Sequence, residues 1–599
     1  MPHPPVVIIG AGPAGLTAAY VLSKAGVQSI VLEKDPTVGG IARTINYKNY
    51  YFDIGGHRFF TKVKSVENIW KEVLGEDLLH RHRLSRIYFN KKFFYYPLRP
   101  LNALLGLGIW NSILISFSYL TSQLFPSRKE ETFEQWVSNR FGKRLYKIFF
   151  KTYTEKVWGI SCNEISAEWA GQRVKGLSLM TALKHAILKK QPGQKDKKSM
   201  IKTLIEEFDY PKLGPGMMWR AMAEIIQKNG SQVCLGKAVE GIRWSENKVE
   251  ALEVRGDGQI ELLSGKDFIS SMPLREALQK FKPEVPKEVL DAANDLKYRD
   301  FLTVALIINK PEVFPDTWIY IHDPEVKVGR IQNFKNWSPF MVPEPNKTCL
   351  GLEYFCFEGD RLWNMPDEKL IELAKRELST LGLVNQNDVE EGTVVRMPKA
   401  YPIYDTTYQK SIDVVRPFLN GFDNLQLVGR NGMHKYNNQD HSMLTAMLSA
   451  ENILGANHDL WAINVEQEYH EEMILEPGEE AALDKLLPGV FPRMDQLGLA
   501  TATGSVCGLL IFFASSWLVI TGGPASVYLK LLNQYFFGYA VTVKGAFIGM
   551  AYGFLWGFLF GWLFAYLRNF FIAYYIYRIK RRAELLTFRD FLDHFGGEG

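Results

Sequence analysis

Residues 6–15 read VVIIGAGPAG, a short apolar run that breaks into glycines and leads into a segment with helical spacing. The glycines follow the pattern G-x-G-x-x-G at Gly10, Gly12 and Gly15. In this pattern the first glycine permits a tight turn, the second lets the backbone approach a pyrophosphate, and the third lets the helix pack on the strand. A second apolar run, IVLE, ends at Glu33, where a carboxylate can bind ribose hydroxyls. These features predict a strand–helix–strand unit that binds a dinucleotide at the helix N-terminus.

Residues 34–43, KDPTVGGIAR, indicate which dinucleotide is bound. They resemble the second signature of FAD enzymes in the amine oxidase and UDP-galactopyranose mutase superfamily. In that superfamily the paired glycines, here Gly39 and Gly40, and the arginine, here Arg43, lie along the FAD pyrophosphate and ribityl chain. Nicotinamide enzymes do not usually carry this second run. The resemblance therefore implies that the cofactor is FAD and not NAD.

Length, charge and cysteine content exclude several functional classes. The chain has 599 residues, enough for two or three domains. Its net charge of +5 is small for this length, and no basic stripe with interleaved aromatic residues is present, so we expect no nucleic-acid partner. None of its cysteines forms a C-x-x-C pair, so neither a metal site nor a disulfide framework is indicated. The opening residues, MPHPP, do not have the pattern of a cleaved secretory signal.

Residues 47–61, YKNYYFDIGGHRFFT, predict a strand, a turn at Gly55 and Gly56, and then His57. An isolated histidine is more often a core residue than a functional one. This stretch, however, resembles the mutase motif Gly-Pro-His-x-Phe, whose histidine lies against the flavin ring. The resemblance implies that His57 shapes the flavin face at the reaction centre. Gly56 stands where that motif has proline.

Residues 101–125 carry no charge and are long enough to span a bilayer. A single span here would place Gly10 and the C-terminal flavin motif described below on opposite sides of the membrane, although one FAD needs both. We therefore expect helices that are buried in a cap domain or lie on the membrane surface.

Residues 153–159 read YTEKVWG and belong to a region of helical spacing, residues 132–190, that we expect to begin the cap. UDP-galactopyranose mutases carry a nearly identical run. In them the tyrosine, here Tyr153, stacks on uracil, and the tryptophan, here Trp158, lines the sugar pocket. Aromatic faces bind bases and sugars in this way. A core aromatic pair is the alternative interpretation.

The resemblance to the mutases continues downstream in the same order. It implies substrate contacts at Arg173, Tyr210, Arg330 and Tyr401, and an adenine contact at Val239. Arg330 corresponds to an arginine that clamps the substrate diphosphate. Arginine suits that role because its planar fork binds phosphate oxygens through two hydrogen bonds.

Residues 429–442, GRNGMHKYNNQDHS, follow a last short strand and precede an apolar helix. The N-terminus of that helix can direct its dipole at the flavin and stabilise the anionic reduced ring. By resemblance, this segment closes the FAD site with Gly429, Arg430, Asn438 and Asp440, and Tyr436 holds the substrate phosphate. Asn438 stands where mutases often have aspartate.

The C-terminal part has a different composition. After a polar, acidic linker, residues 497–521 and 545–567 are free of charge and of bilayer length. We predict two transmembrane helices, with two buried core helices as the alternative. Arg568 and the cluster RIKRR at residues 578–582 follow the second run, so the positive-inside rule places both the tail and the FAD domain in the cytosol.

We therefore expect an α/β fold in which an FAD-binding, Rossmann-like domain of two-dinucleotide-binding topology carries a helical cap, a substrate-domain sheet and a C-terminal transmembrane hairpin. The expected boundaries are 1–90, 216–275 and 406–456 for the FAD-binding domain, 91–215 for the cap, 276–405 for the sheet, 457–496 for the linker, and 497–599 for the hairpin with its tail.

Over roughly the first 460 residues the chain resembles UDP-galactopyranose mutases. This resemblance implies an isomerase that acts on a nucleotide-linked sugar, in which the reduced flavin N5 attacks the anomeric carbon and His57, Arg173 and Arg330 serve the reaction. The alternative is an amine oxidase-like or protoporphyrinogen oxidase-like dehydrogenase or desaturase, acting on an amine or a lipid-soluble substrate, because such an enzyme would share every FAD motif. A scaffold without chemistry is disfavoured by the intact flavin motifs. Either enzyme is compatible with a homo-oligomer.

Overall fold

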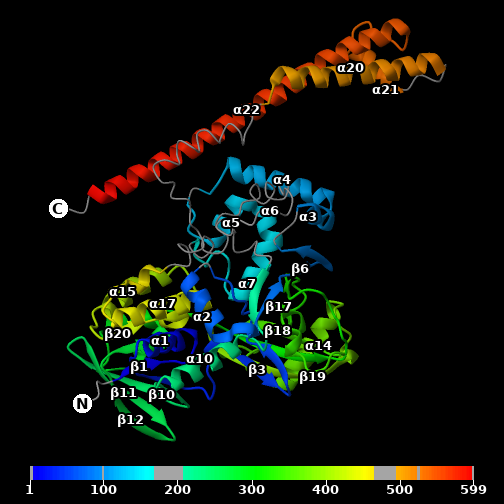
Figure 1. The fold of residues 1–599 in the computed structure, drawn as a ribbon. Helices are drawn as coiled ribbons and strands as arrows, with labels where there is room; N and C mark the ends of the chain where they lie inside the picture. The colour runs from blue at the N-terminus through cyan, green and yellow to red at the C-terminus, as the bar shows by residue number, and fades with distance from the viewer. Residues whose placement is uncertain are drawn as a thin grey trace. The chain divides into compact units, whose positions relative to one another are not determined.

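The computed structural model describes residues 5–61, 63–96, 100–127, 129–167, 207–463, 494–521 and 527–595. The chain divides into two compact units, Met1–Glu471 and Glu472–Gly599 (Figure 1).

A five-stranded parallel sheet forms the centre of the first unit. Its order is β20 (Leu425–Leu427), β13 (Phe268–Ser270), β1 (Val6–Ile9), β2 (Ser29–Glu33) and β9 (Gln232–Leu235). All four residues of β1 are buried, as expected for a central parallel strand covered on both faces. The first helix, α1 (Pro13–Lys24), packs between α17 (Gln439–Ile453) and α10 (Gly216–Lys228) (Figure 1). The sheet therefore collects strands from widely separated parts of the chain, and it confirms the expected α/β class with a central parallel sheet.

A four-stranded sheet extends this region in the order β12 (Gln259–Ser264), β11 (Lys248–Gly256), β10 (Ala238–Ser245) and β14 (Phe281–Lys282). The remaining elements of the region are β3 (Thr44–Tyr47), β4 (Tyr50–Asp53), α2 (Lys64–Leu74), β5 (Leu78–His82), β8 (Glu207–Pro211), α11 (Leu274–Gln279), α12 (Lys287–Asn294), α15 (Tyr408–Asn420) and α16 (Gly429–Gly432).

A seven-stranded sheet forms the second layer. Its order is β19 (Val389–Pro402), β15 (Tyr298–Ile308), β18 (Thr348–Cys356), β17 (Arg330–Asn333), β16 (Trp318–Ile321), β6 (Ser85–Phe89) and β7 (Lys92–Tyr95). Strands β15 and β18 are buried along their whole length. Two helices, α13 (Phe334–Trp337) and α14 (Asp367–Thr380), connect and cover its strands.

The β6–β7 hairpin crosses the boundary that we expected between residues 1–90 and residues 91–215. Asn90 and Lys91 both have positive φ, 50° and 57°. Two such residues form the tight turn that matches the twist of a β-hairpin. The hairpin joins the large sheet because β6 pairs with β16 in parallel.

The helical cap contains α3 (Pro100–Leu107), α4 (Ile109–Leu124), α5 (Phe133–Phe141), α6 (Lys143–Leu145), the π-helical turn η3 (Tyr146–Lys151) and α7 (Thr152–Trp158). A reciprocal capping box between Thr132 and Gln135 begins α5. Gly108, with φ of +83°, separates α3 from α4. The α4 helix lies at the outer edge of the cap (Figure 1). Of the two expected arrangements for residues 101–125, burial within the cap does not describe the outer face of α4, where Trp110 is 80% exposed.

The second unit is built from α20 (Gln496–Thr521), the short α21 (Val527–Leu531) and the long α22 (Val543–Phe595). Small residues let α20 and α22 approach closely, since a Cβ on Gly557 would lie 2.8 Å from the carbonyl oxygen of Thr503. By length and composition, Gln496–Thr521 and Val543–Ala573 could each cross a membrane.

Candidate functional site

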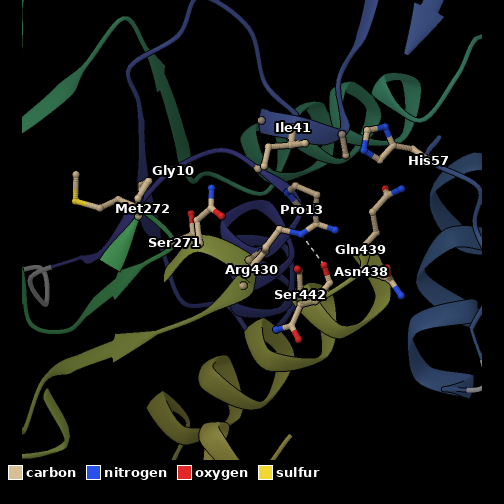
Figure 2. A pocket seen from close by; sticks show the side chains of 18 of the residues that line it. Gly10, Pro13, Ile41, His57, Ser271, Met272, Arg430, Asn438, Gln439 and Ser442 are labelled. Atoms are coloured by element: carbon tan, nitrogen blue, oxygen red, sulfur yellow. Dashed lines mark hydrogen bonds between the residues drawn. The ribbon is translucent and has the colours of Figure 1, made fainter. Parts of the chain in front are cut away.

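A cavity of about 510 Å³ opens where β1 and β2 end. In open α/β sheets, ligands bind at this edge, outside the carboxyl ends of the parallel strands. The expected site residues that line the cavity are Gly10, Gly12, Glu33, Gly40, Gly56, His57, Val239, Arg330, Tyr401, Gly429, Arg430, Tyr436, Asn438 and Asp440. Figure 2 shows Gly10, Ser271 and Met272 at one end of the cavity, His57 and Gln439 at the other, and Pro13 and Arg430 between them.

The turn between β1 and α1 requires its glycines. Gly10 has a φ of +98°, which few other residues adopt readily. A Cβ on Gly15 would lie 1.8 Å from the carbonyl oxygen of Gly10, so no side chain fits at this contact. Gly12, Pro13 and Ala14 at the start of α1 line the cavity, and the unpaired amides of a helix N-terminus can bind phosphate oxygens.

Glu33 is held in place beside this turn. Its carboxylate accepts hydrogen bonds from the amides of Ala11 at 2.7 Å and Asp35 at 3.0 Å. The side chain lines the cavity although only 8% of the residue is exposed. A fixed carboxylate at this position fits the ribose-binding role predicted for it.

The Gly39–Gly40 loop packs directly on the first glycine turn. Gly39 donates its amide proton to the carbonyl of Ala11 at 2.8 Å. Gly40 has a φ of +52° and lies so close that a Cβ there would be 3.3 Å from Cα of Gly12. Arg43 does not line the cavity but forms an ion pair with Asp35 at 2.5 Å.

His57 lies at the second end of the cavity. Its Nδ1 is buried and has no hydrogen-bond partner among the described residues. Burial, with the positive charges of Arg430 and Arg330 nearby, lowers the pKa of His57 to about 3. The imidazole is therefore neutral, and an orphaned ring nitrogen fits contact with a polar ligand. Gly55, with φ of +100°, forms the preceding turn.

The segment from Gly429 to Asp440 closes this end. The Arg430 guanidinium donates to the carbonyls of Asn437 at 2.7 Å and Ala400 at 3.0 Å. Helix α17 begins at Gln439, so its N-terminal dipole faces the cavity, as expected for stabilising a reduced flavin. Buried polar atoms of Asn437 and Gln439 have no partner among the described residues, which again fits a polar ligand.

Aromatic side chains cluster at and behind the cavity wall near Arg330. Tyr401 and Tyr436 stack at 5.6 Å with an interplanar angle of 16°. Trp158 meets both rings at 6.2 Å and 5.8 Å and lies behind them, outside the cavity lining. Tyr153 stacks on His322 at 4.5 Å and meets Tyr320, which does line the cavity, edge to face. One face of Tyr153 is therefore already covered by a protein ring.

Arg330 is paired inside the protein. Its Nε and Nη2 donate to the same carboxylate oxygen of Glu353, at 2.8 Å and 2.5 Å. Glu353 has no exposed surface, and its other oxygen accepts a hydrogen bond from Gln332. The third guanidinium nitrogen, Nη1, lies near Gly56 and is the part of Arg330 nearest the His57 loop.

Sequence reasoning missed several residues of this site. Glu353 is the one charged residue of β18, TCLGLEYFC, and an acidic residue inside so apolar a strand is a usable signal. Arg58 and Trp318 also line the cavity, with the Arg58 guanidinium 5.8 Å from the Trp318 ring centre. No sequence signal separates Trp318 from the other buried tryptophans.

Among the described residues, Tyr210 is an expected substrate residue that, like Tyr153 and Trp158, does not line the cavity. Tyr210 is fully buried, donates its hydroxyl proton to Asp53 and contacts the sulfur of Met341, so its predicted substrate contact is not supported. The reason is that β8 pairs with β5 and turns this side chain into the core. Arg173 lies outside the described residues.

We expect Asp53→Asn to flatten the dependence of stability on pH. Burial raises the pKa of Asp53 to about 7, and the hydrogen bonds from Tyr210 and Thr44 only partly oppose this shift. In the unfolded chain the carboxyl ionises near about 4. Between these values the folded protein retains a proton that the unfolded chain releases. The free energy of unfolding therefore falls as pH rises, by at most about 1.4 kcal/mol per pH unit.

Thermal unfolding between about pH 5 and pH 8 measures this slope. Asp257→Asn is the matched control because Asp257 has a side chain that is 96% exposed. It should keep the wild-type slope. Equal slopes for wild type and Asp53→Asn would contradict the prediction.

Comparison with known proteins adds a family and a fold. A family model described as flavin containing amine oxidoreductase matches residues 13–438. An L-amino-acid oxidase of Crotalus adamanteus is 49% identical over 113 residues, which are 16% of this chain and 21% of the oxidase. The match thus spans about a fifth of the length of that relative.

Solved structures resemble the chain over a greater length. A reduced UDP-galactopyranose mutase has a TM-score of 0.67 at 20% identity, covering 78% of this chain and 99% of the mutase. A double mutant of putrescine oxidase has a TM-score of 0.52 at 15% identity, covering 76% and 99%. At these identities the likeness establishes a shared fold.

Proposed function

The chain belongs to the family of flavin-containing amine oxidoreductases. Within this family, we propose that it is a membrane-anchored flavoenzyme that acts on a nucleotide-linked sugar. Membership confirms the superfamily and the FAD cofactor expected from the sequence. The substrate and the anchoring are the proposed part.

Five segments of this chain would hold FAD. The amides at the start of α1 and the turn of Gly10 and Gly12 suit the pyrophosphate, and Glu33 suits a ribose. Val239 lines the cavity beside them, as an adenine contact would require. His57 and the N-terminus of α17 meet at the flavin end. Bound FAD supplies a ring whose N5 can exchange electrons or attack an electrophilic carbon.

The observation that carries the substrate proposal is the juxtaposition of arginines and aromatic rings in one cavity wall. Arg330 comes from β17, and Arg58 from the loop after His57. Trp318, Tyr320 and Tyr401 line the cavity with them. Guanidinium groups bind phosphates, and aromatic faces bind bases and sugars. The neutral His57 would leave the charge of a diphosphate to these arginines and, as we propose, to Arg173.

A specific observation also favours the second candidate, an oxidoreductase for an amine or a lipid-soluble substrate. The positive charge of Arg330 is already compensated by Glu353, which reduces its value as a phosphate clamp. The local match to an L-amino-acid oxidase points to the same class of chemistry.

Titration of the purified protein with UDP and UDP-galactose separates the two candidates. We expect a saturable change of the flavin absorbance in dithionite-reduced protein with micromolar to millimolar affinity, since ligand binding beside the ring alters its environment. CDP serves as the base control. No response to millimolar UDP would contradict the sugar-nucleotide proposal, and anaerobic bleaching of the oxidised flavin by amines would then support the second candidate.

The anchoring proposal assigns Gln496–Thr521 and Val543–Ala573 as two spans with both ends in the cytosol. Its support is the apolar outer surface of these helices, where Phe513 and Trp517 are 63% and 68% exposed. Extraction of the full-length protein from membranes by carbonate alone would contradict it.

A further inference from the structure

The α4 helix presents apolar side chains outward along its whole length. We define the α4 face as Trp110, Ile113, Leu114, Phe117, Leu120 and Leu124, which are between 45% and 80% exposed. They recur at intervals of three or four residues, so they share one side of the helix. A contiguous row of large apolar side chains on a surface marks an interaction site.

The orientation of α4 is fixed by contacts on its other side. The Arg144 guanidinium donates to the Asn111 side chain at 2.6 Å, and the Arg144 amide donates to Ser118 Oγ at 3.0 Å. Ile115 is only 7% exposed, and a Cβ on Gly142 would lie 2.8 Å from the amide nitrogen of Tyr119. These contacts hold one side of α4 against the cap, so the opposite, apolar side points outward.

The dimensions of this region suit a helix that lies on a bilayer. At 16 residues α4 is about 24 Å long, shorter than the hydrocarbon core of about 30 Å. The left-handed Gly108 prevents α3 and α4 from forming one longer helix. Residues 100–127 contain no charged side chain, so nothing in them resists entry into the interfacial region.

The residues that flank the uncharged stretch 100–127 in the sequence are predominantly basic. Lys91, Lys92 and Arg99 precede it, and Arg128 and Lys129 follow it, before the acidic pair Glu130 and Glu131. Lys91 and Lys92 are exposed in the β6–β7 turn, and Lys92 donates to the carbonyl of Gly106 in α3 at 2.9 Å. Basic side chains beside an apolar helix face favour anionic lipid headgroups.

We infer that the α4 face is a docking surface for an anionic lipid bilayer, on which the flavin-binding unit lies without crossing it. The inference rests on the proposed anchoring in one respect. Residues 464–493 join the unit to α20, and a chain of that length reaches at most about 100 Å. Whatever the arrangement of the two units, anchored helices would keep the α4 face within reach of the same membrane.

Site-directed spin labels on the full-length protein test this inference. The labels replace Phe117 on the α4 face, Phe513 on α20 and Leu262 on β12, which are 65%, 63% and 57% exposed. The background carries Cys507→Ser and Cys234→Ser, because the other three cysteines are buried. The protein is reconstituted in nanodiscs of phosphatidylcholine with phosphatidylglycerol, and the accessibility of each label to oxygen and to a nickel chelate is measured.

We expect oxygen accessibility at positions 117 and 513 to exceed nickel accessibility by about twofold or more, and the reverse at position 262. In nanodiscs of phosphatidylcholine alone, the ratio of oxygen to nickel accessibility at position 117 should fall, whereas the ratio at position 513 should stay the same. An unchanged ratio at position 117 would overturn the anionic preference.

An aqueous label at 117 with a lipid-exposed label at 513 would overturn the inference and leave the anchoring intact. A label at 117 shielded from both reagents would indicate a protein partner, such as a second copy of the chain, and would also overturn it. A lipid-exposed 117 with an aqueous 513 would support the inference and remove the anchoring.

Discussion

The Gly15→Ala variant should purify without flavin. The added Cβ would lie 1.8 Å from the carbonyl oxygen of Gly10 and 3.0 Å from its carbonyl carbon. Both are backbone atoms, so the overlap is relieved only if α1 moves away from the turn that follows β1. That movement would displace the amides that suit the pyrophosphate. The ratio of flavin to protein absorbance, and the flavin released on denaturation, measure the loss.

Gly12→Ala provides a matched control with a different expected result. A Cβ on Gly12 would meet only Cα of Gly40, at 3.9 Å, which is ordinary contact. The apoprotein should therefore unfold at the wild-type temperature, whereas FAD affinity should fall by about tenfold or more, because the backbone can no longer approach the pyrophosphate. A Gly15→Ala protein with stoichiometric flavin would refute the structural role assigned to this glycine.

The glycine turn was predictable because its determinants are local. Gly10, Gly12 and Gly15 lie within six residues of one another, and Glu33 follows at the end of the adjacent strand, where its carboxylate accepts from the Ala11 amide. Spacing alone specifies such a unit. The Gly39–Gly40 loop follows shortly after Glu33 and lies against this turn, as its resemblance to the second FAD signature implied.

Pairings between distant strands were not predictable from spacing. Arg330 meets Glu353 because β17 and β18 are antiparallel neighbours in a register that places the two residues opposite each other. Tyr210, which the β5–β8 pairing turns into the core, meets Asp53 there across 157 residues. A resemblance in residue order carries no information on such partners, which decide whether a side chain is available to a substrate.

The side of α4 that is exposed was also not predictable from the sequence. The apolar composition of residues 101–125 is equally compatible with a buried helix and with an outward face. The contacts of Arg144 and Gly142 with α4, and the burial of Ile115, establish which side of the helix the protein covers.

The Arg330→Ala variant should lose both stability and affinity for UDP. Removal of the guanidinium leaves the Glu353 carboxylate, which has no exposed surface, with Gln332 as its described partner. Breaking a buried ion pair from one side typically costs about 3–5 kcal/mol. If Arg330 also contacts the diphosphate, UDP binding should weaken by about 2–4 kcal/mol. Titration monitored by flavin absorbance or calorimetry measures this loss. Flavin content at low temperature should remain that of the wild type.

A double variant separates these two effects. Arg330→Met with Glu353→Gln removes both charges while nearly preserving volume, so its stability should lie much closer to that of the wild type than Arg330→Ala does. UDP affinity should nevertheless stay low, because the donor is gone. Arg330→Lys should restore part of the affinity, since lysine supplies the charge without the planar fork. A double variant that binds UDP as the wild type does would show that Arg330 is structural, and the diphosphate would then have to be sought at Arg58 or Arg173.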